Sequence, residues 1–329
     1  MSSNKCFNEI IKIGSDFSFE SNIISSDLIE NDNDVIVGVT TKNKAIKFYK
    51  FSDDIVIESG SICQNNIKNY QVLDLCLSKK HLCIDSNIIY GVFSCSDGNI
   101  RILNKIPIEN EVVTNLEQIH IDDSRINRVK ILEYRPATVS VTNTGKIIIH
   151  DLEKKLPLEV LDKHSDSLTA VTTHPKSPLI AVGEFSGYLM VWDLRIGRYI
   201  CDFNTNSLEK EAMHQDQVNS LEFNSAGNLL ASSSDDGLSA IWDLRKQKIM
   251  RCFSYGTDYL CKALFANDDK SLITVSSTSL LTSWSIYENK LCEVKQMEGI
   301  KMNTCGFSKD LSKFYFAYQS KTIDFYSNI

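Results

Sequence analysis

Gly187-Tyr-Leu-Met-Val-Trp192-Asp193-Leu194-Arg195 and Gly237-Leu-Ser-Ala-Ile-Trp242-Asp243-Leu244-Arg245 are two copies of one pattern, 50 residues apart. Each copy places a glycine, which suits a tight turn, five residues before a tryptophan, with mainly apolar residues between them. A short apolar run, Leu179–Val182 or Leu229–Ala231, precedes each glycine. Two apolar runs joined by a glycine turn are typical of a β-hairpin, so the pattern predicts a fold of repeated antiparallel strands.

The same frame recurs along the whole chain in weaker copies. The tryptophan position is occupied in turn by Phe48, Leu103, His150, Trp192, Trp242, Trp284 and Phe325. The spacings are 55, 47, 42, 50, 42 and 41 residues, close to the roughly 40–45 residues of a repeat that folds into one four-stranded propeller blade. The sequence therefore predicts seven such sheets.

These repeats resemble the WD-repeat (Trp-Asp repeat) family, strongly over residues 160–250 and more weakly over the rest. The resemblance implies an all-β fold: a seven-bladed β-propeller of four-stranded antiparallel sheets, in a single domain spanning residues 1–329. In that family a structural tetrad links the inner turn of a blade to its outer strands by hydrogen bonds, which satisfies buried polar groups. The resemblance assigns this tetrad to His214, Ser234, Asp236 and Trp242 of blade five.

Blade four departs from the tetrad pattern. It keeps His164 and Trp192 but has Glu184 and Ser186 where serine and aspartate are expected. We therefore expect blade four, like the weaker blades, to depend more on packing.

The end of the chain leaves the seventh blade one strand short. Only four residues follow Phe325, so this blade has three strands of its own. Residues 5–13 form a spare strand-like segment ahead of the first repeat, and propellers of the WD-repeat family close their ring with such a segment. We expect residues 5–13 to be the outer strand of blade seven, which removes an unpaired sheet edge.

Charge and composition argue against nucleic-acid and membrane partners. Lys and Arg number 35 against 42 Asp and Glu, a net charge of −7, whereas binding to a phosphate backbone needs a concentrated basic face. No apolar stretch approaches the roughly 18 residues of a membrane span. One basic cluster is expected to be a solvated face: Arg125, Arg128, Lys130 and Arg135, balanced by Asp122, Asp123 and Glu133.

The cysteines indicate the cellular compartment. The chain has ten of them, none in a Cys-x-x-Cys pair, and most lie in apolar runs. Free cysteine packs as a small apolar residue, and reduced thiols are typical of the cell interior. The expected location is therefore cytoplasmic or nuclear.

Motifs for catalysis are absent from the sequence. There is no phosphate-binding loop, metalloprotease helix, serine elbow or dinucleotide fingerprint. The carboxylate pairs Asp122-Asp123 and Asp235-Asp236 lack an accompanying nucleophile or base, and the six histidines show no metal-ligand spacing. We expect no enzyme activity, no metal and no cofactor.

Binding surfaces are expected on the rims of the propeller, because loops on a rigid scaffold carry function. The residue before the turn between the second and third strands is Thr41, Ser96, Asn143, Phe185, Asp235, Ser277 or Tyr318. Among these, Phe185 and Tyr318 are the candidate aromatic anchors, with Asp235 and Asn143 beside them. The alternative, that both rings pack against neighbouring blades, stays open. An insertion at residues 204–213 is expected on a rim, as a short helix or an extended loop.

Arg195 and Arg245 end the two Trp-Asp-Leu-Arg motifs and are expected on the opposite face. In propellers that serve as substrate receptors of cullin-type ubiquitin ligases, an arginine at this position in adjacent blades marks the face that docks the linker subunit. A guanidinium can also form a structural pair with a carboxylate of its own blade. Both interpretations remain open at this point.

The predicted function is that of a non-catalytic protein-interaction scaffold, a subunit of a multiprotein nuclear or cytoplasmic complex. One alternative is a substrate receptor of a cullin-type ubiquitin ligase. Another is a subunit of an RNA-processing or nuclear pore complex. The RNA-processing alternative rests on a weaker likeness to the propeller of the pre-mRNA splicing ubiquitin ligase, in Ser167-Leu-Thr, His174-Pro, Val191-Trp-Asp-Leu, Trp242-Asp-Leu-Arg-Lys246 and Phe325-Tyr-Ser327. The pore alternative rests on a weaker likeness to the small propeller nucleoporin of the Y-shaped pore complex, in His174-Pro followed by Gly187-x-Leu-x-x-Trp192-Asp-x-Arg-x-Gly197 and the next repeat.

Overall fold

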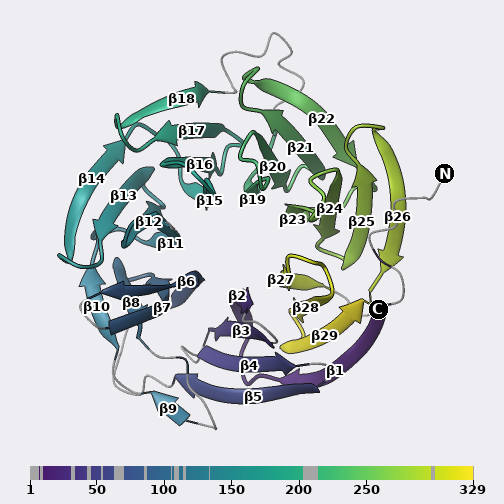
Figure 1. Cartoon of the computed structure of the whole chain (residues 1–329), viewed down its shortest axis with the longest axis horizontal. Helices are drawn as coiled ribbons and strands as arrows, with labels where there is room; N and C mark the ends of the chain where they lie inside the picture. The colour runs from purple at the N-terminus through teal and green to yellow at the C-terminus, as the bar shows by residue number, and fades with distance from the viewer. Residues whose placement is uncertain are drawn as a thin grey trace. The chain divides into compact units, whose positions relative to one another are not determined.

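The computed structural model shows β-strands joined by turns and arranged in seven sheets (Figure 1). The insertion at 204–213 and most of residues 5–9 lie outside the part that the structure describes. The described residues are 7, 10–30, 34–42, 46–52, 55–62, 70–84, 87–104, 106, 111–113, 116–132, 134–202, 214–297 and 301–328.

The chain divides into two compact units, of which the first consists mainly of Lys163–Met302. This unit holds three antiparallel sheets, blades four, five and six, whose strands follow one another in chain order. Blade four consists of β15 (Leu168–Thr173), β16 (Leu179–Glu184), β17 (Leu189–Asp193) and β18 (Arg198–Asp202). Blade five consists of β19 (Val218–Phe223), β20 (Leu229–Ser234), β21 (Leu238–Asp243) and β22 (Lys248–Ser254). Blade six consists of β23 (Leu260–Phe265), β24 (Ser271–Ser276), β25 (Leu280–Ser285) and β26 (Lys290–Gln296).

The second unit consists mainly of Glu9–Asp162 and Ser312–Ile329 and holds four sheets. Blade one consists of β2 (Ile23–Glu30), β3 (Asp34–Thr41), β4 (Ile46–Ser52) and β5 (Ile55–Ile62), and a fifth strand, β9 (Glu111–Val113), pairs in parallel with β5. Blade two consists of β6 (Val72–Ile84), β7 (Asn87–Cys95), β8 (Asn99–Leu103) and β10 (Glu117–His120). Blade three consists of β11 (Ile126–Leu132), β12 (Ala137–Thr142), β13 (Lys146–Asp151) and β14 (Leu156–Asp162).

The last sheet, blade seven, joins the two ends of the chain. It consists of β27 (Met302–Phe307), β28 (Lys313–Tyr318), β29 (Thr322–Asn328) and, as its outer strand, β1 (Ile10–Ser18). The expected closure by the N-terminal strand is therefore present, but the paired residues are 10–18 instead of 5–13. An ion pair between Lys12 and Asp324 of 2.8 Å and an edge-on contact of Phe17 with Phe325 accompany this register.

The weak repeats have the same strand irregularities as the strong ones. In six of the blades the register between the first and second strands shifts just after the start of the first strand, as at Val218/Ser220 in blade five and Ile23/Ser25 in blade one. A second shift between the third and fourth strands recurs at the tryptophan position or directly beside it. A bulge bends and twists a strand. The blades whose repeats match the pattern weakly therefore bend at the same positions as those that match it strongly.

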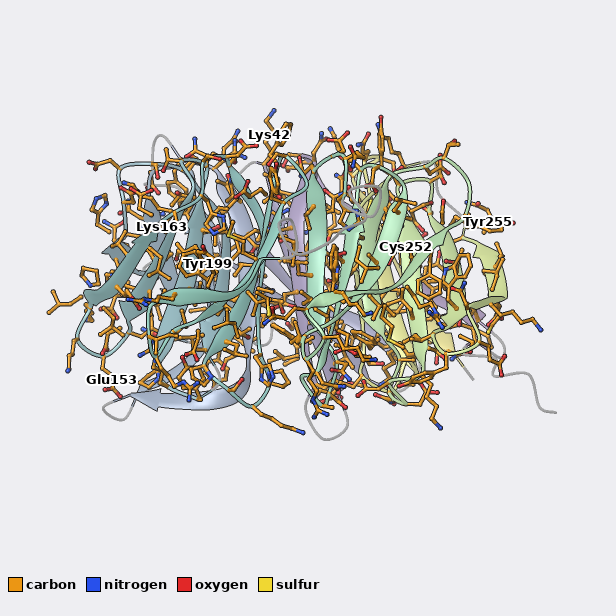
Figure 2. All side chains as sticks on the ribbon, turned by 90° about the horizontal axis from the view of Figure 1, so that it is seen from above. Lys42, Glu153, Lys163, Tyr199, Cys252 and Tyr255 are labelled. Carbon is orange, nitrogen blue, oxygen red and sulfur yellow. The ribbon has the colours of Figure 1, made fainter. Side chains whose placement is uncertain are left out.

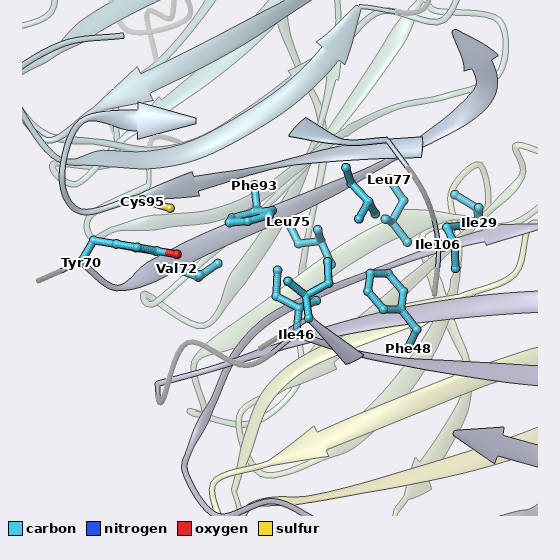
Figure 3. Close-up of a cluster of buried hydrophobic side chains, with 12 residues drawn as sticks. Ile29, Ile46, Phe48, Tyr70, Val72, Leu75, Leu77, Phe93, Cys95 and Ile106 are labelled. Atoms are coloured by element: carbon cyan, nitrogen blue, oxygen red, sulfur yellow. The ribbon is translucent and has the colours of Figure 1, made fainter. Parts of the chain in front are cut away.

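Apolar side chains fill the space between neighbouring sheets within each unit. In the cluster of Figure 3, Phe48 of blade one packs with Leu75 and Phe93 of blade two, and all three are buried. A Cβ atom at Gly38 would lie 2.7 Å from Leu75, so the sheets approach too closely there for a larger residue. All seven tryptophan positions of the repeat lie in third strands and are buried: Phe48, Leu103, His150, Trp192, Trp242, Trp284 and Phe325.

Alternating strand directions separate the turns into two groups. Turns between second and third strands lie at one end of each sheet, and turns between third and fourth strands lie at the other. Figure 2 shows this for the second unit, where Lys42 and Glu153, one from each kind of turn, lie at opposite edges. Side chains on these turns are therefore presented on two separate faces.

Candidate protein-interaction surface

The buried polar relay of blade five links two strands, the turn between them and the loop before the blade. The indole nitrogen of Trp242 donates a hydrogen bond of 2.8 Å to Ser232 Oγ, and Ser232 lies 2.7 Å from His214 Nε2. His214 Nδ1 lies 2.9 Å from Asp236 Oδ2. Since the indole can only donate and the carboxylate can only accept, the serine oxygen accepts from Trp242 and His214 Nδ1 donates to Asp236.

The serine of this relay is Ser232, so the assignment to Ser234 was wrong. Leu230 pairs with Trp242 across the β20–β21 ladder and Ser232 pairs with Ala240, which puts Ser232 one alternation from the indole on the same face. Ser234 lies two residues further, at the end of β20, and its hydroxyl donates to Asp216 O at 3.0 Å. It also accepts a hydrogen bond from the Asp236 amide.

Asp236 is held as a carboxylate by its partners. Burial alone would raise the pKa of Asp236, but hydrogen bonds from His214 and the charge of that ring, together with the backbone amides of Leu238 and Gln215, lower it below its usual 3.8. The relay thus fixes the turn after β20 to the segment before β19.

Blade four contains a relay of its own, contrary to the expectation that it relies on packing. Trp192 Nε1 donates directly to His164 Nε2 at 3.1 Å, and His164 Nδ1 lies 2.6 Å from Glu184 Oε1. The Ser186 hydroxyl donates to the second carboxylate oxygen of Glu184 at 3.0 Å. Val182 stands where blade five has Ser232, so tryptophan meets histidine without a bridging hydroxyl, and the longer glutamate takes the place of the aspartate.

Blade two replaces the relay with an ion pair between a buried arginine and a partly buried aspartate. Arg101, whose side chain is almost fully buried, bonds Asp97 at 2.9 Å and stacks on the Tyr70 ring with 3.6 Å to its centroid. Arg101 keeps its charge because the hydrogen bond to Asp97 and nearby groups outweigh burial, which alone would lower the arginine pKa. Each of these blades therefore anchors the turn after its second strand, but with different chemistry.

The two candidate aromatic anchors differ in the structure. Phe185 lies in the turn between β16 and β17 and is 53% exposed, and its amide donates to Ser167 O at 2.9 Å. Tyr318, the last residue of β28, is only 2% exposed, with its hydroxyl 3.4 Å from that of Tyr326. Tyr318 as an exposed anchor was therefore wrong, because its ring points into the blade instead of out of the turn.

The two polar rim candidates are also unlike each other. Asn143 is exposed, and its amide donates to Arg125 O at 3.0 Å. Asp235 is partly buried and accepts a 2.6 Å hydrogen bond from the Asn219 side chain, which also donates to Leu260 O of blade six. Asp235 thus helps to join blades five and six as well as facing the rim.

Arg195 and Arg245 occupy equivalent positions after β17 and β21, and their side chains behave differently. Arg195 bonds Asp193 of its own blade through Nε and Nη2, the shorter contact being 2.6 Å, and this pairing lowers the pKa of Asp193. Arg245 is exposed, and Asp243 instead caps its backbone amide and pairs with Lys246 at 3.5 Å. The structural pair exists in blade four, whereas the Arg245 guanidinium has no ion-pair partner among the described residues.

The basic cluster of blade three is not one solvated face. Lys130 lies on the inner strand β11. Burial alone would lower the pKa of its ammonium, but Cys76 and the nearby Asp27 and Asp74 raise it. Asp74 itself accepts hydrogen bonds from Ser25 and from the Val129 amide. Arg135 stacks beside Tyr134, 5.5 Å from its ring centroid. Lys130 is therefore partly buried and lies near carboxylates of blades one and two, and Glu133 lies outside the described residues.

Three further exposed aromatic residues lie at the same end of blades four to six as Phe185, outside the single position per blade that the repeat pattern indicates. Tyr188 follows the β16–β17 turn, and Tyr255 and Tyr259 lie between β22 and β23. The segment before the first strand of a blade lies at the same end of the sheet as the turn between the second and third strands. In blade six the Ser277 amide donates to Tyr259 O, and in blade five the Asp235 amide donates to Gln217 O. We call the turn segments 185–188, 214–217, 235–237 and 255–259 the unit-one rim.

Sites of other kinds are not seen in the described part of the chain. No group of three or more His, Cys, Asp or Glu side chains there is placed to bind a metal. Nor does this part contain a helix of the length and apolarity needed to cross a membrane.

Comparisons with known proteins agree with this geometry. The structure matches the crystal structure of the WD40 beta propeller domain of Doa1 over 98% of both chains, with a TM-score of 0.76 and 11% identity, which confirms the propeller fold. Among curated proteins, the chain is 28% identical over 113 residues to SIR4-interacting protein SIF2 of Saccharomyces cerevisiae, covering 34% of this chain and 21% of the relative.

Two relatives from Schizosaccharomyces pombe are 30% identical. They are the Periodic tryptophan protein 2 homolog, over 124 residues, and the U3 small nucleolar RNA-associated protein 21 homolog, over 122 residues. The matches cover 37% and 36% of this chain but only 14% and 12% of those relatives. The family model described as "Nucleolar protein 10-like, N-terminal domain" matches residues 125–326, more than half of the chain. The chain therefore belongs to the nucleolar protein 10-like N-terminal β-propeller family.

Proposed function

We propose that this chain is a non-catalytic scaffold subunit of a multiprotein nuclear complex of the nucleolar type. The nucleolar family and the similarity to the U3 small nucleolar RNA-associated protein 21 homolog support the compartment. The observation that carries the proposal is the unit-one rim, where Phe185 and Tyr259 are 53% and 55% exposed on turns tied by backbone hydrogen bonds. Rigid, exposed aromatic side chains are the residues that most often supply binding energy at protein interfaces.

Quantitative affinity purification tests this proposal. The tagged chain is compared with a Phe185→Ala/Tyr259→Ala variant and with Tyr287→Ala, a matched control because Tyr287 is 58% exposed in the turn between β25 and β26, at the other end of its sheet. We expect the rim variant to recover its partners about tenfold less than the wild type, since loss of a central aromatic anchor costs roughly 2 kcal/mol or more. The same partners at the same level with all three proteins would contradict the proposal.

A second candidate function is that of a substrate receptor of a cullin-type ubiquitin ligase. The supporting observation is Arg245, whose exposed guanidinium is free to meet a carboxylate of a linker subunit. The test is purification of an Arg245→Ala variant, followed by quantification of cullin linker subunits. Specific loss of a linker would support this function, and absence of any linker from the wild-type sample would exclude it.

A further inference from the structure

The unit-one rim combines exposed aromatic rings with several carboxylates. Its four segments contain Asp216, Asp235, Asp236 and Asp258 and neither lysine nor arginine. Asp236 belongs to the blade-five relay. Asp235 accepts from the Asn219 amide and Asp258 from the Thr278 hydroxyl at 2.6 Å, while Asp216 accepts from the backbone amide of the next residue. None of these last three carboxylates forms an ion pair with a residue that the structure describes.

The rim segments form one continuous surface across blades four, five and six. A Cβ atom at Gly187 would lie 2.2 Å from His214 O and 3.1 Å from Asp216 O, so the blade-four turn abuts the loop of blade five. A Cβ atom at Gly237 would lie 3.3 Å from Asp258 O, so the blade-five turn in turn abuts the loop of blade six. Phe185 and Tyr259 therefore stand at the two sides of a strip whose middle carries Asp216 and Asp235.

The aromatic side chains of this strip are largely open to solvent. Tyr188 and Tyr255 are 41% and 42% exposed, in addition to Phe185 and Tyr259. The segments themselves are fixed, because in each blade the turn between the second and third strands is hydrogen-bonded to the loop that precedes the first strand. A partner would thus meet preorganised rings and charges, which lowers the entropic cost of binding.

We propose that the unit-one rim binds an arginine- or lysine-rich segment of a protein partner. This inference rests on the proposed scaffold function and specifies the chemistry of the partner. Aromatic faces attract guanidinium and ammonium groups, and a free carboxylate beside them adds a charge-assisted hydrogen bond. The same carboxylates repel phosphate groups, so this surface selects a basic peptide over RNA.

Fluorescence anisotropy with defined probes tests the proposal on the full chain. The probes are a labelled twelve-residue peptide of alternating arginine and glycine, the same peptide with glutamate in place of arginine, and a twelve-nucleotide oligouridine. We expect the arginine peptide to bind and the other two probes not to bind. A Tyr259→Ala/Asp216→Asn variant is expected to weaken the arginine peptide roughly tenfold, because it removes one ring and one carboxylate from the strip.

The matched control is Tyr287→Ala/Glu288→Gln, which removes one exposed tyrosine and one exposed carboxylate from the turn between β25 and β26. This control is expected to change the affinity less than about twofold. Equal loss in both variants would show attraction to overall negative charge and would overturn the proposal, as would failure of the arginine peptide to bind or binding of the RNA in its place. The scaffold function would survive any of these results if purification still showed partners lost with Phe185→Ala/Tyr259→Ala.

Discussion

Ser232 shows how a single residue allows a blade to pair its buried polar side chains with one another. Its hydroxyl accepts a hydrogen bond from the indole of Trp242 and forms another with one ring nitrogen of His214. The other ring nitrogen bonds Asp236. Every polar atom of this relay is satisfied by the next, which is the condition for burying such groups without a large cost. In blade four the same condition is met with Glu184 and without a serine.

Replacing the two serines of β20 separately distinguishes their roles. We expect Ser232→Ala to lower the free energy of unfolding by about 2–3 kcal/mol, since it leaves the buried His214 and Trp242 nitrogens unpaired. Ser234→Ala, the matched control one alternation away, is expected to cost about 1 kcal/mol, because the groups it leaves are backbone atoms nearer solvent. Urea denaturation monitored by tryptophan fluorescence measures both. A larger loss for Ser234→Ala would contradict the relay described here.

The carboxylate of the relay predicts a dependence of stability on pH. The folded-state pKa of Asp236 lies below its usual 3.8, so its stabilising effect is complete above the unfolded-state pKa and disappears as pH falls through the folded one. We expect Asp236→Asn to reduce the free energy of unfolding by about 1–3 kcal/mol at neutral pH. The difference from wild type should shrink below roughly pH 4. Denaturation series at several pH values measure this, and a difference independent of pH would contradict it.

Sequence reasoning located the relay but not all of its members. The resemblance to the WD-repeat family identified the histidine, the aspartate and the tryptophan of the relay. The serine was misplaced because Ser232 and Ser234 share one face of β20, and only the reach of the indole across the strand pair decides between them. Tyr318 was misjudged for a similar reason: its position in the repeat is that of Phe185, but the direction of the ring depends on local packing.

The turns are the elements that couple neighbouring blades. Gly187 has a φ of +88° and lies against the backbone of His214, whereas Gly256 has a φ of +81° and nothing within 4 Å of its Cβ position. Both glycines adopt a conformation that other residues avoid, but only Gly187 is also confined by the next blade. The glycine frame in the sequence predicted the turn, but the contact between blades depends on the packing of the sheets.

A pair of glycine variants isolates this contact. Gly256→Ala is expected to cost about 1 kcal/mol of stability, from backbone strain alone. Gly187→Ala carries the same strain and also forces blade four away from blade five, so we expect a loss of at least about 3 kcal/mol. Thermal unfolding of the two variants side by side measures the difference. Equal losses would show that the turns of blades four and five do not constrain each other.

The outer strand β1 is the element that completes the last sheet, and its removal has a direct consequence. Deleting residues 1–18 leaves the edge of β29 unpaired and uncovers Phe325, which β1 contacts through Phe17. An open, apolar edge strand favours association between chains, so we expect this truncated protein to aggregate. Light scattering after expression checks it, with a deletion of residues 1–6 as the control that retains β1. A soluble monomer lacking β1 would contradict the closure.

At the scale of the whole molecule, the fold class was predictable and the surface was not. Seven positions of one frame, recurring every 41–55 residues, fixed the number of blades even where Phe48 or Leu103 replaces tryptophan, because the pattern of strands and turns repeats regardless of that residue. The exposed face depends on which loop residues the sheets leave uncovered, as at Tyr255 and Tyr259. A propeller with such a face suits the scaffold function proposed above, because loops on a rigid framework offer a partner fixed contacts.

Sedimentation of the native protein through a glycerol gradient tests the scaffold function most directly. If the chain is a complex subunit, the tagged protein from a gently prepared nuclear extract should sediment far faster than a free 37.2 kDa chain, and Phe185→Ala/Tyr259→Ala should move it to the monomer position while Tyr287→Ala does not. Sedimentation of the wild-type chain as a free monomer, at physiological salt and without crosslinker, would contradict the account.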